Sequence, residues 1–99
     1  MKGVLRVRVL TLTLVYPNPF SNSTTISFTL QQTQKVSVSI YDMEGRLIKT
    51  LADDQIQTGT HQLTWNAKDE KGNAVSAGIY LLEMQAGNYV ETKKIVVEK

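Results

Sequence analysis

The fold of this chain is decided by the stretch Gly59-Thr-His-Gln-Leu-Thr-Trp-Asn-Ala-Lys-Asp-Glu-Lys-Gly-Asn-Ala-Val-Ser-Ala-Gly-Ile-Tyr80. It contains the only tryptophan and three of the six glycines. Leu63 and Trp65 alternate with polar residues, which is the pattern of a strand with one buried face. A second strand pattern begins at Gly78, and its apolar row starts with Tyr80. We expect the two strands to lie in neighbouring or facing sheets, with the Trp65 and Tyr80 rings in the middle of a sandwich.

The same alternation recurs on both sides of this stretch, with turn signals about every ten residues. The expected strands lie within residues 1–16, 26–30, 36–41, 46–51, 62–66, 79–86 and 89–98. Asp and Gly at the first and fourth positions predict turns at residues 42–45 and 69–72, Gly87-Asn88 predicts a hairpin, and residues 52–58 read as a polar loop. The pattern predicts an all-β fold, a seven-stranded antiparallel immunoglobulin-like β-sandwich.

Length and composition exclude several classes of protein. With 99 residues, the chain can form one domain with a single core. A net charge of +2 with both signs interspersed does not provide the clustered basic surface of a nucleic-acid groove. The absence of cysteine excludes a disulfide framework, a thiolate zinc site and a cysteine nucleophile.

The first sixteen residues have an irregular strand pattern. Residues 5–9 alternate aliphatic side chains with arginine, residues 10–14 alternate leucine with threonine, and the apolar phase slips by one between the two runs. Such a slip predicts a bulge, a bend or a change of sheet. A signal peptide is the alternative, but threonines interrupt the apolar run and no Ala-x-Ala site follows. We therefore treat residues 1–15 as an N-terminal strand or linker remnant, and residues 16–99 as the domain.

No residue pattern indicates catalysis. His61 is the only histidine, no serine lies in a Gly-x-Ser-x-Gly context, and we expect His61 at the rim of the sandwich. The acidic pairs are Asp42 with Glu44, Asp53 with Asp54, and Asp69 with Glu70. The first and third are explained as turn formers, and none matches a calcium loop, although a structural calcium ion remains an alternative. We predict no enzyme activity and no cofactor-binding or metal-binding residue.

The chain ends with a lysine pair, Lys93 and Lys94, followed by Ile95-Val96-Val97. One interpretation is a final strand whose lysines prevent edge-to-edge aggregation. The other is an exposed strand whose unpaired backbone groups and small positive patch are captured by strand addition.

Six segments, taken together, resemble the C-terminal sorting domain of the type IX secretion system of Bacteroidetes. They are Tyr16-Pro-Asn-Pro-Phe20, Ser23-Thr-Thr-Ile-Ser-Phe28, Val38-Ser-Ile-Tyr-Asp-Met-Glu-Gly-Arg46, Gly59-Thr-His-Gln-Leu-Thr-Trp65, Gly78-Ile-Tyr80 and Lys93-Lys-Ile-Val-Val97. Their order and spacing match the family over residues 15–99. The immunoglobulin-like domain of the flagellar hook-capping protein shares the segments around Trp65 and Tyr80.

The resemblance implies a non-enzymatic sorting signal that directs a larger cargo protein through the outer membrane. Its implied partners are the translocon, a surface sortase that commonly removes the domain, and an upstream cargo domain. Its implied location is the periplasm in transit, then the cell surface or the medium. The residues that match the family's motifs are Pro17, Asn18, Pro19, Gly45, Gly78, Tyr80, Lys93, Lys94, Ile95 and Val96, with Trp65 in the core.

A structural or adhesive immunoglobulin-like module of a surface protein is the alternative. A sorting domain normally follows hundreds of cargo residues, whereas a short basic segment precedes Tyr16, so we expect the chain to be a fragment or an excised domain. That segment also reads as a strand that could pair with another copy, which predicts a possible dimer.

Overall fold

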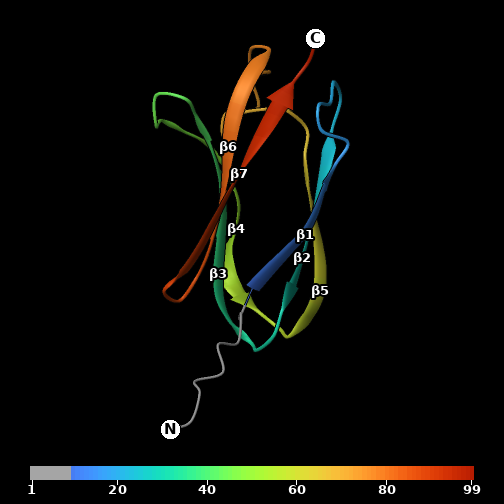
Figure 1. Ribbon diagram of the computed structural model, residues 1–99. Coiled ribbons are helices and arrows are strands. Elements are labelled where there is room, and N and C mark those ends of the chain that lie inside the picture. Colours follow the sequence, from blue (N-terminus) through green and yellow to red (C-terminus); the bar gives the residue numbers. More distant parts are fainter. Residues whose placement is uncertain (1–9) are drawn as a thin grey trace, which may run out of the picture.

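The computed structural model describes residues 10–99, with side chains from Leu14 onward, and these residues form two facing β-sheets (Figure 1). The strands are β1 (Leu10–Tyr16), β2 (Thr24–Leu30), β3 (Gln34–Asp42), β4 (Leu47–Ile56), β5 (Gly59–Trp65), β6 (Gly78–Ala86) and β7 (Tyr89–Val97). A three-stranded sheet has the order β1-β2-β5 and a four-stranded sheet the order β4-β3-β6-β7, with every pair antiparallel. The predicted seven-stranded antiparallel sandwich is confirmed. This part of the chain contains no helix that could cross a membrane.

The sandwich has two distinct ends. The connections β1–β2, β3–β4 and β5–β6 meet the C-terminus at one end, which we call the motif end (top of Figure 1). The connections β2–β3, β4–β5 and β6–β7 lie at the other, which we call the hairpin end. The strand register gives the same assignment of the motif end, because Asp42 lies opposite Tyr80, and Gly78 opposite Val97.

The core is formed by the inward row of each strand, as the alternation predicted. The side chains that are fully buried are Trp65, Phe28, Ile26, Leu30, Ile40, Leu82, Met84, Ile95, Val36, Val38 and Val97. No buried side-chain nitrogen or oxygen atom in the described part of the chain lacks a hydrogen-bond partner. The core is therefore apolar, and its few polar groups are satisfied.

Three aromatic rings interlock between the sheets. The Trp65 ring meets the Tyr80 ring edge-on at 5.5 Å between centroids, and the Phe20 ring at 5.6 Å. The indole N–H donates to the Lys68 carbonyl at 3.0 Å, and the Tyr80 hydroxyl donates to the Ser76 carbonyl at 2.7 Å. The rings lie near the motif end rather than in the middle of the sandwich, because Trp65 is the last residue of β5.

The prediction of a polar loop at residues 52–58 is wrong for most of its length. β4 continues to Ile56, and its register with β3 runs from Tyr41 opposite Leu47 to Gln34 opposite Ile56 with two irregularities. Ala52 and Ile56 pack against the core, whereas the acids between them are exposed. β4 is an edge strand, so it can remain paired with β3 while presenting polar side chains to solvent.

The predicted irregularity of the first strand is confirmed, although at a different residue. The register of β1 against β2 shifts between Leu12 and Leu14, which leaves Leu14 exposed and buries Val15. The change of sheet follows at the prolines, where Phe20 forms a parallel bridge to Val97 of the other sheet. The slip expected between residues 9 and 10 falls at the boundary of the described residues, and the arginine run lies outside them.

Candidate functional site

Asn18 joins the first predicted motif to the last one. Its side-chain Nδ2 donates to the Lys94 carbonyl at 3.0 Å, and its Oδ1 accepts the Val96 N–H at 3.0 Å. The Asn18 side-chain amide presents an N–H donor and a carbonyl acceptor side by side, as a peptide group does, so it takes the place of a neighbouring strand. These two hydrogen bonds join parts of the chain that lie 76 and 78 positions apart in the sequence.

Phe20 continues this ladder toward the C-terminus. Its N–H donates to the Val96 carbonyl at 3.0 Å, and its carbonyl accepts the Glu98 N–H at 2.7 Å. The Phe20 side chain is buried against Trp65, whereas the Tyr16 side chain is 66% exposed. The Thr24 hydroxyl donates to the Pro17 carbonyl at 2.6 Å, which ties the first residue of β2 to the connection between β1 and β2.

The outer edge of β7 is therefore divided into two halves. Residues 18–20, which we call the corner segment, form hydrogen bonds with residues 94–98. The expectation of unpaired backbone groups is therefore wrong for this half of the edge. The backbone N–H and C=O groups of Lys94, Val96 and Glu98 point away from β6, and by the alternation of the ladder those of Thr92 do the same. Among the described residues, the corner segment reaches no further along β7 than Lys94, and we call residues 90–93 the open half.

The lysine pair does not form one positive patch. Successive side chains of a strand point to opposite faces, so Lys93 shares the core-facing side of β7 with Ile95, and Lys94 shares the outer side with Val96. Ile95 is fully buried, Val96 is half-buried, and both lysines are exposed. Only Lys94 lies on the broad outer face of the four-stranded sheet, opposite Leu81.

The two predicted motif glycines shape the backbone of the motif end. Gly45 and Gly78 have φ of 86° and 151°, a region that other residues rarely adopt. A Cβ atom added to either would have no heavy atom within 4 Å. Their requirement for glycine is therefore conformational and does not come from close packing.

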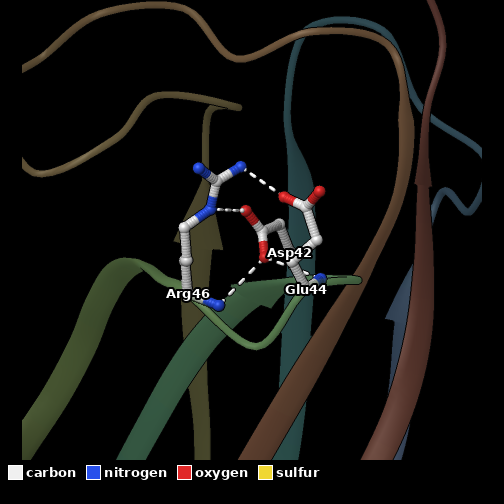
Figure 2. Close-up of polar contacts among 3 residues, drawn as sticks. All are labelled: Asp42, Glu44 and Arg46. Carbon is white, nitrogen blue, oxygen red and sulfur yellow. Dashed lines mark hydrogen bonds and ion pairs between the residues drawn. The ribbon is translucent and has the colours of Figure 1, made fainter.

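The turn that contains Gly45 is closed by three charged side chains (Figure 2). Asp42 Oδ1 accepts the Glu44 and Arg46 N–H groups at 2.9 Å, and Asp42 Oδ2 accepts Arg46 Nε–H at 2.8 Å. Glu44 forms an ion pair with the same guanidinium. The backbone hydrogen bond from Arg46, with its side chain, lowers the pKa of Asp42. The resemblance had marked only Gly45 here, although the Asp-x-x-x-Arg spacing signals the pair.

The second Asp-x-x-Gly turn has the same construction, as predicted. Asp69 Oδ1 accepts the Lys71 and Asn73 N–H groups at 2.9 Å, and the Gly72 N–H donates to the Asp69 carbonyl at 3.0 Å. Each aspartate thus satisfies backbone donors that its turn would otherwise leave unpaired.

His61 lies at the hairpin end, away from the predicted motif residues. Its ring is 5.6 Å from the Phe28 ring, and Nε2 is 2.7 Å from the Gln57 carbonyl oxygen. Within residues 10–99, no three His, Asp or Glu side chains are grouped closely enough to hold a metal ion. The arrangement can present a shaped surface.

Comparison with known families gives one match over most of the chain. The sequence model of the family described as "Secretion system C-terminal sorting domain" matches residues 14–98. Among curated proteins, the basal-body rod modification protein FlgD of Salmonella typhimurium is 33% identical over 69 residues, which are 69% of this chain and 30% of FlgD. The chain thus spans about a third of the length of this curated relative.

Solved structures share the fold. PorZ, a surface component of the type IX secretion system of Porphyromonas gingivalis, is 29% identical with a TM-score of 0.62, over 87% of this chain and 11% of PorZ. Dimeric latent PorU from the same organism is 22% identical with a TM-score of 0.72, over 89% of this chain and 9% of PorU. FlgD from Xanthomonas campestris is 20% identical with a TM-score of 0.60, over 89% of this chain and 64% of that chain. At their identities, PorU and this FlgD show the fold alone.

Proposed function

The chain belongs to the family of secretion system C-terminal sorting domains, and we propose that it is the non-enzymatic signal that carries a larger cargo protein through the outer membrane. A type IX sorting domain implies a secretion machinery, an upstream cargo, and export to the cell surface or the medium. We further propose that the domain meets the outer-membrane translocon from the periplasm and is removed by a surface sortase.

The contact between the corner segment and β7 carries this proposal. By the resemblance, Pro17, Asn18 and Pro19 belong to the first motif of the family, and Lys93, Lys94, Ile95 and Val96 to the last. Asn18 holds these motifs together through two hydrogen bonds to β7. We therefore propose that the translocon recognises a folded composite surface made by both, rather than a linear C-terminal tail.

The experiment is export of a periplasmic reporter fused to residues 1–99 in a host with a type IX system. The fusion keeps β1, because Leu10–Tyr16 pairs with β2; a domain boundary at residue 16 stays a prediction. Deleting residues 94–99 should leave the reporter in the periplasm, and continued export would overturn the proposal.

A point variant separates recognition from folding, because the deletion also removes the buried side chains of Ile95 and Val97. Lys94→Gln changes only an exposed side chain and should reduce export several-fold. Lys71→Gln, in the exposed turn between β5 and β6, is the matched control and should be exported like the wild type. Equal export of both variants would remove Lys94 from the recognised surface.

The similarity to FlgD favours a second candidate, a structural module of a surface assembly. Such a module would act by binding to copies of itself or to neighbouring subunits, and would not carry an unrelated reporter out of the periplasm. The same fusion therefore separates the two functions.

A further inference from the structure

The outer face of the four-stranded sheet contains a hollow near the motif end. Its volume is about 450 Å³, and its lining comes from β3, the following turn, β6 and β7. The lining residues are Tyr41, Asp42, Met43, Gly45, Leu81, Glu83 and Thr92. Tyr41 lies opposite Leu81, and Glu83 opposite Thr92, so the floor of the hollow is two adjacent rows of the sheet.

The surroundings of the hollow are apolar on the side of the motif end. Met43 is 62% exposed, Leu47 lies exposed beside Tyr41, and Ile79 is exposed beyond Leu81. Toward the hairpin end the same face becomes polar, where Lys35 pairs with Asp53 at 3.6 Å. The apolar side chains are therefore concentrated where the hollow lies, as at a binding site rather than scattered singly.

One carboxylate in the hollow has no partner. Among the described residues, the Glu83 carboxylate takes part in no side-chain hydrogen bond or ion pair, whereas both carboxylate oxygens of Asp42 are occupied. The Asp42, Glu44 and Arg46 group retains one net negative charge. Lys94, next to Leu81, is the nearby positive charge that opposes these acids.

We propose that this hollow is a binding site for an arginine or lysine side chain, presented by a partner protein on a segment with aliphatic neighbours. Met43 and Leu81 would cover the methylene stem, the Tyr41 ring would contact the cation, and Glu83 would accept its hydrogen bonds. The exposed Leu47 and Ile79 would contact the aliphatic neighbours. This binding does not depend on whether the domain is exported.

The test is a titration of the ¹⁵N-labelled chain with the peptide acetyl-Leu-Arg-Val-amide, followed by amide chemical shifts. Up to about 10 mM peptide is needed, because one cation contact gives weak affinity. We expect saturable shifts at Tyr41, Leu81, Glu83 and Thr92. The same peptide with citrulline, a neutral isostere of arginine, should bind at least about fivefold more weakly.

Three variants assign the binding to the named charges. Glu83→Gln should raise the dissociation constant at least about fivefold, and Lys94→Gln should lower it, because each removes one charge beside the cation. Glu98→Gln, an exposed change outside the hollow, should leave it unchanged. The amide spectra of the variants verify that they are folded.

Absence of saturable binding, equal binding of the citrulline peptide, shifts away from the hollow, or wild-type binding by Glu83→Gln would each overturn the proposal. The reporter experiment measures a different property, because Lys94→Gln is expected to reduce export while it increases the affinity for the peptide. Failure of one test therefore leaves the other interpretable.

Discussion

The motif end and the hairpin end of the sandwich are held by different kinds of interaction. At the motif end, the Phe20, Trp65 and Tyr80 rings interlock, and Asn18 pairs with a strand from the other end of the sequence. At the hairpin end, aliphatic side chains such as Val36 and Ala86 close the core. Aromatic packing and a side-chain amide thus hold the first end, whereas aliphatic packing closes the second.

Two hydrogen bonds of Thr58 at the hairpin end span less of the sequence than those of the Asn18 side chain at the motif end. The β6–β7 hairpin is closed by Gly87 and Asn88, directly between Ala86 and Tyr89. Thr58 donates from its hydroxyl to the Leu30 carbonyl and from its N–H to the Thr33 hydroxyl, each at 3.0 Å. These bonds tie adjacent connections together over 25 and 28 positions of the sequence, compared with the 76 and 78 positions that the Asn18 bonds span.

The largest expected difference between the ends concerns Trp65. Trp65→Ala should lower the free energy of unfolding by about 3 to 5 kcal/mol, because it removes a fully buried ring and two aromatic contacts. His61→Ala, at the hairpin end, should cost less than about 1 kcal/mol. Urea unfolding followed by circular dichroism measures both without the indole signal. Equal losses would mean that the ends do not differ as described.

Asn18 tests the long-range contact. Asn18→Ala should cost about 1 to 2 kcal/mol, because it removes two hydrogen bonds to β7, one of them partly buried. Hydrogen exchange at the Val96 amide should accelerate in this variant. Asn88→Ala, in the opposite hairpin, is the matched control and should change stability by at most about 0.5 kcal/mol. An unchanged Val96 exchange rate would contradict the role given to Asn18.

Much of this fold could be predicted from the sequence, because alternation and turn chemistry are local. The inward rows, the Asp-x-x-Gly turns and the packing of Trp65 against Tyr80 were all expected and are confirmed. The extension of β4 to Ile56 was missed, because an edge strand tolerates polar residues that read as a loop.

The contacts of the candidate site were less accessible. The resemblance supplied both Asn18 and Val96, but a hydrogen bond between residues 78 positions apart leaves no periodic signal. The separation of Lys93 from Lys94 follows from strand alternation and could have been predicted. The hollow around Glu83 depends on which rows of three strands lie side by side, and that requires the register.

Acid should weaken the motif end through Asp42. Its pKa in the folded chain lies below the ordinary value of 3.8, so its stabilising contribution is complete above about pH 4 and is lost as the pH falls through the folded-state pKa. Asp42→Asn should therefore be less stable than the wild type at neutral pH, and the difference should shrink in acid. Urea unfolding midpoints of both proteins, taken at neutral pH and at a pH below 3.8, measure this difference in stability. A difference that stays constant would show that the charge of Asp42 does not support the turn.

The smallest expected change in stability comes from the two lysines, and it distinguishes the halves of the β7 edge. Lys93 lies in the open half, where a charge on the core-facing side opposes pairing with another strand edge, whereas the corner segment already covers the backbone at Lys94. Lys93→Thr and Lys94→Thr should each alter unfolding by at most about 0.5 kcal/mol. Lys93→Thr alone should self-associate at high concentration in sedimentation velocity. Association of both variants, or of neither, would mean that the corner segment does not decide which part of this edge is available.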